Sequence, residues 1–129
     1  MLARLMRAEA EGEGELGMLM AENVMVNRAR VNCPDFQDVN SIEEWCFNPL
    51  VALKQHRKAT FIKVLEKREI RLARKVINGE RHHPAEFALW FFRPGRILSC
   101  SMNWGKWNSG RYKLHCFYTP LATECPSVY

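Results

Sequence analysis

The sequence predicts a single α+β domain, with helices in its first half and a small antiparallel sheet in its second half. Apolar residues recur at helical spacing on both sides of a Glu- and Gly-rich run at 7–17. A further helical pattern, with basic residues on its outer side, covers 66–77. Two short stretches of β-forming residues follow, at 88–92 and 112–118. Helices that precede strands along the chain are typical of the α+β class.

The first two helices flank the run at 7–17. Helical spacing is seen before the run in Leu2, Leu5 and Met6, and after it in Leu16, Leu19, Met20, Val24 and Asn27. The second helix is expected from about Leu16 to Val31, ending before Pro34. Gly12, Gly14 and Gly17 interrupt the helical pattern and allow a tight turn, with positive φ where the turn requires it.

The run itself carries four glutamates that alternate with small residues. A carboxylate at the end of a helix, facing a Gly-rich turn, suits a general acid, because the apolar helix behind it can desolvate it and raise its pKa. Glu9 is best placed for this role, since it is nearest the apolar face of the first helix. The alternative is a solvated loop in which Glu13 and Glu15 favour the start of the second helix through its dipole.

The second half contains the predicted sheet and an aromatic segment. The helix at 66–77 is expected to end at a cap formed by Asn78 and Gly79. The segment 95–111, between the two predicted strands, is expected to be a loop that contains Trp104 and Trp107. These indoles have two interpretations: a platform for the apolar face of a sugar ring, or a cover for the sheet.

Two polar residues in the predicted elements also have open roles. Asn27 lies on the apolar face of the second helix, where it makes either a structural hydrogen bond or a ligand contact. His115 lies in the last predicted strand, and a lone histidine there is more typical of a structural residue than of a catalytic one.

Length and composition limit the class of protein. The 129 residues suffice for one domain with a real core, and 47% hydrophobic with 26% charged residues is typical of a globular chain. No apolar run approaches the roughly 20 residues that span a bilayer. The first residues lack the basic region, apolar stretch and cleavage site of a signal peptide.

The formal net charge of +5 is unevenly distributed. Residues 1–22 hold five Glu against two Arg, whereas residues 54–75 hold nine Lys and Arg against two Glu. A basic half is attracted to any polyanion, such as nucleic acid, an anionic wall polymer or a membrane surface. A basic nucleic-acid-binding domain is therefore one competing interpretation, and it depends on this charge alone.

Five cysteines lie at 33, 46, 100, 116 and 125. No C-x-x-C pair and no Cys/His cluster with zinc spacing is present, so no metal site of that type is expected. The odd number leaves one thiol over if disulfides form.

Several motifs together resemble the SleB/CwlJ family of spore cell wall hydrolases, and the second half resembles its CwlJ branch. The matching residues are Ala3–Leu5, Ala8–Gly14, Gly17–Met18, Val24, Val26–Arg28, Asn78–Arg81, His83–Ala85, Ala88–Pro94, His115–Tyr118, Cys125 and Val128–Tyr129. The resemblance covers most of residues 2–44 and 66–129 and identifies residues 1–129 as one cell wall hydrolase domain.

The resemblance implies a lysozyme- or transglycosylase-like fold that cuts the glycan strands of spore-cortex peptidoglycan during germination. The first glutamate of the family's A-E-A-x-G-E motif is its proposed catalytic acid, and it corresponds here to Glu9. Glu13 corresponds to the second glutamate and is expected to support the site. Four further residues of the predicted elements are expected to bind substrate or support the site: Asn27, Trp90, His115 and Tyr118.

The resemblance also carries expectations about location and partners. It implies a place at the spore coat or cortex boundary without a signal peptide, with peptidoglycan as substrate and a coat protein as a further partner. No specific nucleic-acid partner and no transmembrane segment are expected. The CwlJ branch is associated with calcium-dipicolinate as a trigger, although no calcium-binding motif is visible in this sequence and no metal-ligand residues are assigned.

The middle of the chain departs from the family pattern. The family carries Q-P and F-E or Q-F elements after the second helix, but residues 45–65 do not match them, while both flanks match without a change in length. Two compensating frameshifts explain this, since residues 44–67 read one frame over can spell V-V-F-Q-P-L-S-G-F-E-A-A-Q-K-G-N-F-H-Q-S-A-R-E-K. This hypothesis also removes Cys46, leaving four cysteines with three pairings. An unshifted reading of the coding DNA across this segment would contradict it.

Overall fold

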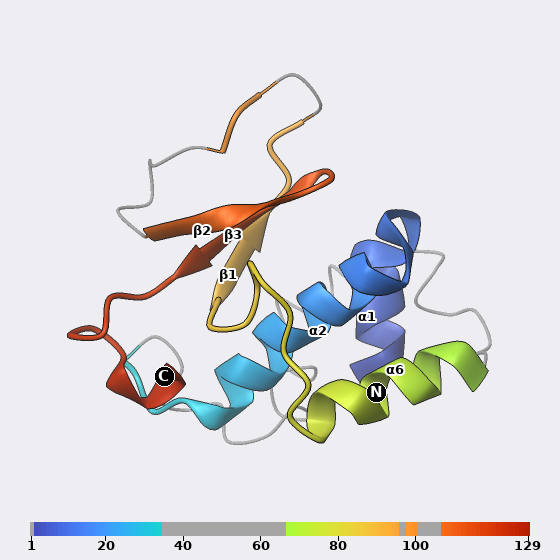
Figure 1. Cartoon of the computed structure of the whole chain (residues 1–129), viewed down its shortest axis with the longest axis horizontal. Coiled ribbons are helices and arrows are strands. Elements are labelled where there is room, and N and C mark those ends of the chain that lie inside the picture. The colour runs from blue at the N-terminus through green and yellow to red at the C-terminus, as the bar shows by residue number, and fades with distance from the viewer. Residues whose placement is uncertain (1, 35–66, 96–97, 101–106) are drawn as a thin grey trace.

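The computed structural model of the 129-residue chain describes residues 2–34, 67–95, 98–100 and 107–129 (Figure 1). Among the described residues, three α-helices lie on one side of the molecule: α1 (Leu2–Ala10), α2 (Gly14–Arg30) and α6 (Lys67–Ile77). A short 3₁₀ turn, η1 (Glu11–Glu13), joins α1 to α2. The other side is a sheet of three strands, β1 (Trp90–Phe92), β2 (Trp107–Tyr112) and β3 (His115–Thr119), followed by η2 (Pro126–Val128). This order confirms the predicted α+β class.

The helices pack on one another through an apolar core. Its fully buried members come from all three helices and include Met6, Met18, Met25, Leu72 and Val76. A buried ion pair crosses the same interface, because the Arg7 Nε atom of α1 donates to Glu69 Oε1 of α6 at 2.8 Å. Arg7 is 3% exposed and Glu69 is fully buried, so this contact lies inside the helical layer.

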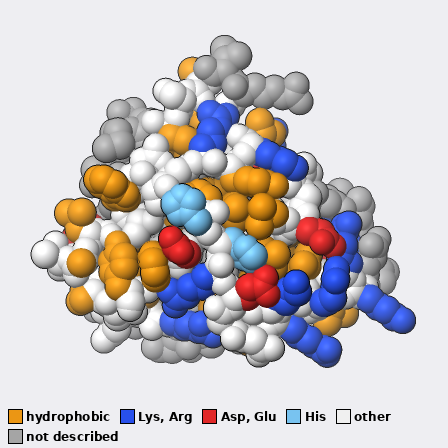
Figure 2. Space-filling model, viewed as in Figure 1, with side chains coloured by type: hydrophobic (Ala, Val, Ile, Leu, Met, Phe, Trp, Pro, Cys, Tyr) orange, Lys and Arg blue, Asp and Glu red, His pale blue; other side chains and the backbone are white. Residues whose placement is uncertain are grey.

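Helix α6 is amphipathic and ends as the sequence predicts. Its basic side chains lie on the outer side, where Figure 2 shows Lys and Arg gathered over this part of the molecule. Gly79 follows with φ of 100°, and its amide donates to Val76 O at 2.9 Å. The Glu80 amide donates to Lys75 O at 3.0 Å, which completes a Schellman-type cap.

The sheet has the order β1-β3-β2, and both strand pairs are antiparallel. Trp90 is opposite Tyr118 in the first pair, and Trp107 is opposite Thr119 in the second. The central strand β3 is buried along its whole length. Figure 1 shows the sheet covering one side of α2, with the C-terminal turn beside the end of that helix.

The predicted strand boundaries in the second half were wrong. Residues 107–111, assigned to a loop, belong to strand β2, and the strand expected at 112–118 is split by a turn at Lys113–Leu114. β2 lacks the alternation of apolar and polar residues that marks a half-buried strand, and a bulge between Asn108 and Gly110 shifts its register. Lys113 adopts φ of 47° in the turn.

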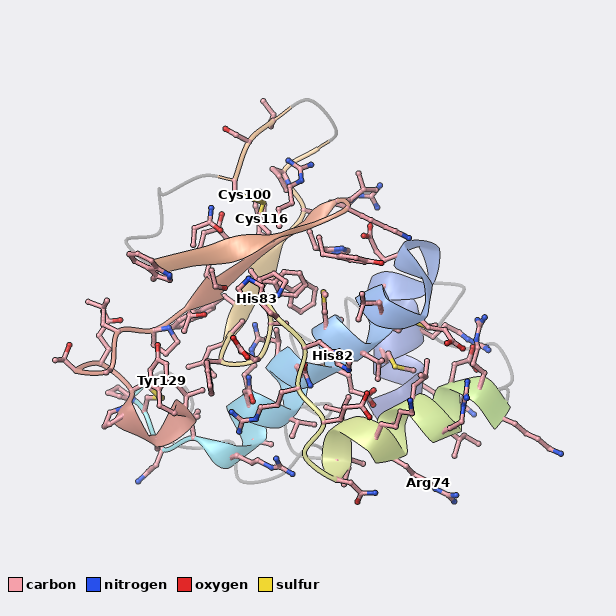
Figure 3. The ribbon with its side chains drawn as sticks, viewed as in Figure 1. Arg74, His82, His83, Cys100, Cys116 and Tyr129 are labelled. Carbon is pink, nitrogen blue, oxygen red and sulfur yellow. A yellow bond between two sulfur atoms is a disulfide. The ribbon has the colours of Figure 1, made fainter. Side chains whose placement is uncertain are left out.

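Two disulfides join distant parts of the chain. Cys33 is paired with Cys125, with Cα atoms 5.3 Å apart, and Cys100 is paired with Cys116, with Cα atoms 5.6 Å apart (Figure 3). These bonds select one of the three pairings that the sequence left open. Cys46 and the atypical segment 45–65 lie outside the described residues. In the described ranges, no helix combines the length and apolar character needed to cross a bilayer.

Candidate active site

Glu9 lies in the last turn of α1, one residue before the helix ends. The chain then passes through η1 and enters α2 at Gly14, which has φ of 80°. Gly14 is the one glycine of the acidic run whose φ is positive, so it supplies the turn that the sequence predicted. The side chain of Glu9 lies outside the described part of the structure, whereas the backbone that positions it is described.

Glu13 ties this helix junction to the β2–β3 turn. Its side chain is 4% exposed, and its Oε2 atom accepts a hydrogen bond from the Leu114 amide at 3.2 Å. Its Oε1 atom lies 3.4 Å from Nδ1 of His115. The Lys113 ammonium donates to the backbone carbonyl of Glu13 at 2.7 Å. Three consecutive residues of the hairpin therefore hold the segment that follows Glu9.

Gly17 provides the space that Glu13 occupies. A Cβ atom at Gly17 would lie 2.2 Å from Cβ of Glu13 and 3.4 Å from Cε1 of Tyr112. Gly17 lies inside α2 and not in the turn, which corrects the expectation that it interrupts the helix. Its role is close packing, because a larger residue would displace the Glu13 side chain.

His115 is buried at the start of β3, next to Glu13. Its ring centroid is 5.5 Å from that of Phe91 on β1. Whether Nδ1 donates to Glu13 depends on the tautomer of the ring. The structure thus brings together two of the residues that the resemblance singles out, Glu13 and His115, next to the helix junction that carries Glu9.

Asn27 lies away from this junction and holds a backbone loop. Its Nδ2 atom donates to the carbonyl oxygens of Glu86 and Ala88, each at 3.1 Å. With 3% of its surface exposed, Asn27 makes the structural hydrogen bond that was one of its two interpretations. One turn earlier, Asn23 donates to Glu80 O and accepts from the His82 amide, both at 2.8 Å. Sequence reasoning missed Asn23, although a second Asn four residues before Asn27 could have indicated it.

Trp90 and Tyr118 are also separate from the Glu13–His115 contact. They are opposite one another on β1 and β3. Tyr118 is 1% exposed, and because it is three residues from His115 it lies on the other face of β3. Trp90 is partly buried against a cluster that contains Leu89 and Val128. These contacts place both aromatic residues in the packing of the sheet.

Glu22 is a buried acid that the sequence analysis did not single out. Its side chain is fully buried in α2, and in the described part of the chain neither carboxylate oxygen has a hydrogen-bond partner. Burial raises the pKa of Glu22 from 4.5 to about 8. Glu22 lies four residues after Met18 and four before Val26, and both of these residues are apolar and buried. This helical spacing could have indicated that Glu22 lies on the buried face of α2.

Metal-ligating side chains do not gather in the described residues. Among them, no three His, Cys, Asp or Glu side chains form a group that could hold a metal ion.

A solved structure of a known protein has the same kind of fold. The structure resembles the crystal structure of the catalytic domain of the Bacillus cereus SleB protein, with a TM-score of 0.66 over 92% of this chain and 86% of that one, at 21% sequence identity. The chain therefore has the lysozyme-like α+β fold that the family resemblance implied.

Sequence comparison gives the family. A family model described as Cell Wall Hydrolase matches residues 12–118. Proteins named cell wall hydrolase CwlJ are 56% identical in Halalkalibacterium halodurans, 48% in Oceanobacillus iheyensis and 44% in Bacillus subtilis; each comparison covers all of this chain and 89–91% of the relative. The chain belongs to the cell wall hydrolase family and is an enzyme of that class. The family model includes Glu13 and His115, and the full-length relatives also align across Glu9.

Proposed function

We propose that this enzyme cleaves the glycan strands of spore-cortex peptidoglycan during germination, with Glu9 as its general acid. The observation that carries the proposal is that the β2–β3 turn holds the segment directly after α1 through hydrogen bonds. Glu9 lies four residues before Glu13, whose carboxylate and carbonyl oxygens accept hydrogen bonds from the β2–β3 turn. Membership of the cell wall hydrolase family, and full-length relatives named CwlJ, support the substrate class.

We propose that Glu9 donates a proton to the glycosidic oxygen of the bond from N-acetylmuramic acid to the next sugar of the strand. Protonation of this oxygen makes it a better leaving group, and positive charge develops on the sugar as in an oxocarbenium ion. Water then adds to the anomeric carbon in a hydrolase, whereas the 6-hydroxyl of the same sugar adds in a lytic transglycosylase. In either case the Glu9 carboxylate, deprotonated in the first step, takes up the proton that the water or hydroxyl loses. No second carboxylate is assigned a direct role, so the scheme uses a single acid.

Glu13 and His115 are proposed to position the acid and the hairpin beside it. Glu13 is 4% exposed and its carboxylate already accepts a hydrogen bond from the Leu114 amide, so its contacts suit support more than proton transfer to a bound sugar. Fixing a catalytic group in its productive orientation lowers the barrier, because the ordering is complete before the reaction begins.

The expected setting follows the resemblance to the CwlJ branch. We propose that the enzyme acts at the boundary of spore coat and cortex, held there by a coat protein. Activation by calcium-dipicolinate is part of the same proposal. The three relatives named cell wall hydrolase CwlJ support a place at the cell wall. The coat partner and the trigger rest on the resemblance to the CwlJ branch.

Glutamine variants of two glutamates from the same run test the acid. Glu9→Gln removes the proposed proton donor while keeping its shape, and Glu15→Gln is the matched control, because Glu15 is exposed and forms a surface ion pair with Arg71 at 3.1 Å. Digestion of purified cortex is expected to release new glycan ends with the wild type and Glu15→Gln, and none with Glu9→Gln. A folded Glu9→Gln enzyme with wild-type activity would contradict the assignment.

A further outcome separates the alternative function. If neither wild type nor variants release glycan ends, the proposal fails, and the chain is better described as a wall- or coat-associated scaffold with impaired catalysis.

A further inference from the structure

A hollow lined with aromatic and polar side chains lies at the other end of the β2–β3 hairpin from Glu13. Its volume is about 210 Å³, and its lining includes His83, Glu86, Phe87, Trp107, Thr119 and Tyr129. Figure 3 labels His83 and Tyr129 at its borders, and Figure 2 shows the same face of the molecule.

Trp107 is the most exposed large hydrophobic side chain of the described residues, with 61% of its surface accessible. It begins β2, which is an edge strand of the sheet, and is opposite Thr119 of β3. An indole held on a strand at the rim of a hollow gives a flat apolar face that faces solvent. Such a face is costly to leave in water and suits a ligand with its own apolar side.

Two further aromatic rings of the lining, those of Phe87 and Tyr129, are fixed by their neighbours. The ring centroids of Phe87 and Tyr129 are 5.0 Å apart, and the Arg81 guanidinium lies 5.2 Å from the Phe87 centroid. The Tyr129 hydroxyl donates to Pro120 O at 2.6 Å. These contacts already orient both rings, so a ligand would not have to order them.

The loop before β1, which contributes Pro84, Glu86 and Phe87 to the lining, packs against β2. A Cβ atom at Gly110 would lie 2.8 Å from Cβ of Pro84, so β2 and this loop are in direct contact. Asn27 holds the carbonyls of Glu86 and Ala88 from the other side. Glu86 also provides a partly exposed carboxylate, with Oε1 at 3.4 Å from Nδ1 of His83. The hollow therefore combines aromatic faces with a few placed polar groups, as ligand sites commonly do.

The hollow and the Glu13 contact share one face of β3. His115 and Thr119 are four residues apart, so their side chains point the same way, about 13 Å apart along the strand. Phe117 lies between them on the same face and belongs to a buried cluster with Met20 and Val24 of α2, so the hollow and the Glu13 contact lie at opposite ends of a buried strip of β3.

We propose that this hollow binds a pyranose ring of the glycan strand, as a subsite remote from the catalytic acid. The sugar's CH-rich face stacks on Trp107, and its hydroxyl or acetamido groups hydrogen-bond to Glu86 and His83. The inference rests on the proposed function, because it takes the glycan as substrate. A free stem peptide is the competing occupant.

Equilibrium binding to peptide-free glycan strands tests the subsite in a Glu9→Gln background, where the strands stay intact. Adding Trp107→Ala is expected to weaken binding about tenfold, as loss of an aromatic anchor commonly does. Trp107→Phe keeps a stacking face and is expected to retain most of the affinity. Leu121→Ala is the matched control, because it removes an exposed apolar side chain, 51% accessible, from outside the hollow.

The outcomes separate this inference from the proposed function. Unchanged affinity in folded Trp107→Ala, or Trp107-dependent binding of free stem peptide in place of glycan, would overturn the subsite even if the wild type cleaves cortex. Trp107-dependent glycan binding by a wild type that cleaves nothing would uphold the subsite and reject the proposed cleavage.

Discussion

Replacing Glu22 with methionine is expected to stabilise the protein by an amount that grows with pH. The carboxyl is fully buried with no hydrogen-bond partner in the described residues, and burial raises its pKa from 4.5 to about 8. Below pH 4.5 the group is protonated in both the folded and the unfolded states. Above pH 4.5 the unfolded chain releases the proton while the folded chain keeps it, so stability falls as pH rises, until about pH 8.

The size of the effect follows from the difference between the two pKa values. Each pH unit within this window lowers the free energy of unfolding by about 1.4 kcal/mol. At pH 7 the ionisable carboxyl therefore costs about 3 kcal/mol relative to pH 4.5. Methionine removes this cost and suits the site, because the neighbouring turns of α2 carry the buried residues Met18 and Met25.

Denaturant unfolding of wild type and Glu22→Met between pH 4.5 and 8.5 measures the effect, with the disulfides intact in both. The difference between the two curves isolates Glu22, because the other titrating groups are common to both proteins. Glu22→Gln serves as a second variant that keeps the shape and removes the titration. The same pH dependence of stability in the wild type and both variants would show that titration of Glu22 does not lower the stability of the fold.

Two further predictions concern packing and cross-linking. Gly17→Ala is expected to displace the Glu13 side chain, lowering stability by about 1–3 kcal/mol and cortex cleavage by about tenfold or more. Gly12→Ala is its control, because among the described residues no atom beyond its chain neighbours lies within 4 Å of the added methyl group. Equal activity and thermal stability of the two variants would argue against the packing role of Gly17. Replacing both cysteines of the Cys33–Cys125 disulfide with serine is expected to lower the free energy of unfolding by about 4–5 kcal/mol, since the bond closes a separation of 92 residues. Denaturant titration of that variant checks this, and an unchanged midpoint would exclude a stabilising role.

The helices could be predicted from the sequence because their signals are local. Apolar spacing indicated α1 without exact bounds and gave α2 and α6 to within about two residues. The cap at Gly79 follows from its position after the last apolar residue. Strand β2 was missed because its stability comes from pairing with β3, and its own residues carry a bulge and no alternation.

The candidate site was predicted in part. Glu9 and Glu13 were singled out because their spacing with glycine matches a family motif. The partners of Glu13 lie about a hundred positions further along the chain, so local sequence reasoning could not reveal them. The same holds for Asn23, whose partners are nearly sixty residues away. The close contact between Gly17 and the Glu13 side chain likewise depends on the three-dimensional path of the backbone, which the residue types alone do not reveal.

The measurement that tests the central claim most directly is mass spectrometry of the glycan products from purified cortex, treated with wild type or with Glu9→Gln. The wild type is expected to release fragments ending in muramic acid, either reducing or anhydro, and the folded variant is expected to release none. Fragments of the same kind and amount from Glu9→Gln would contradict the assignment of Glu9 as the acid that cleaves the glycan.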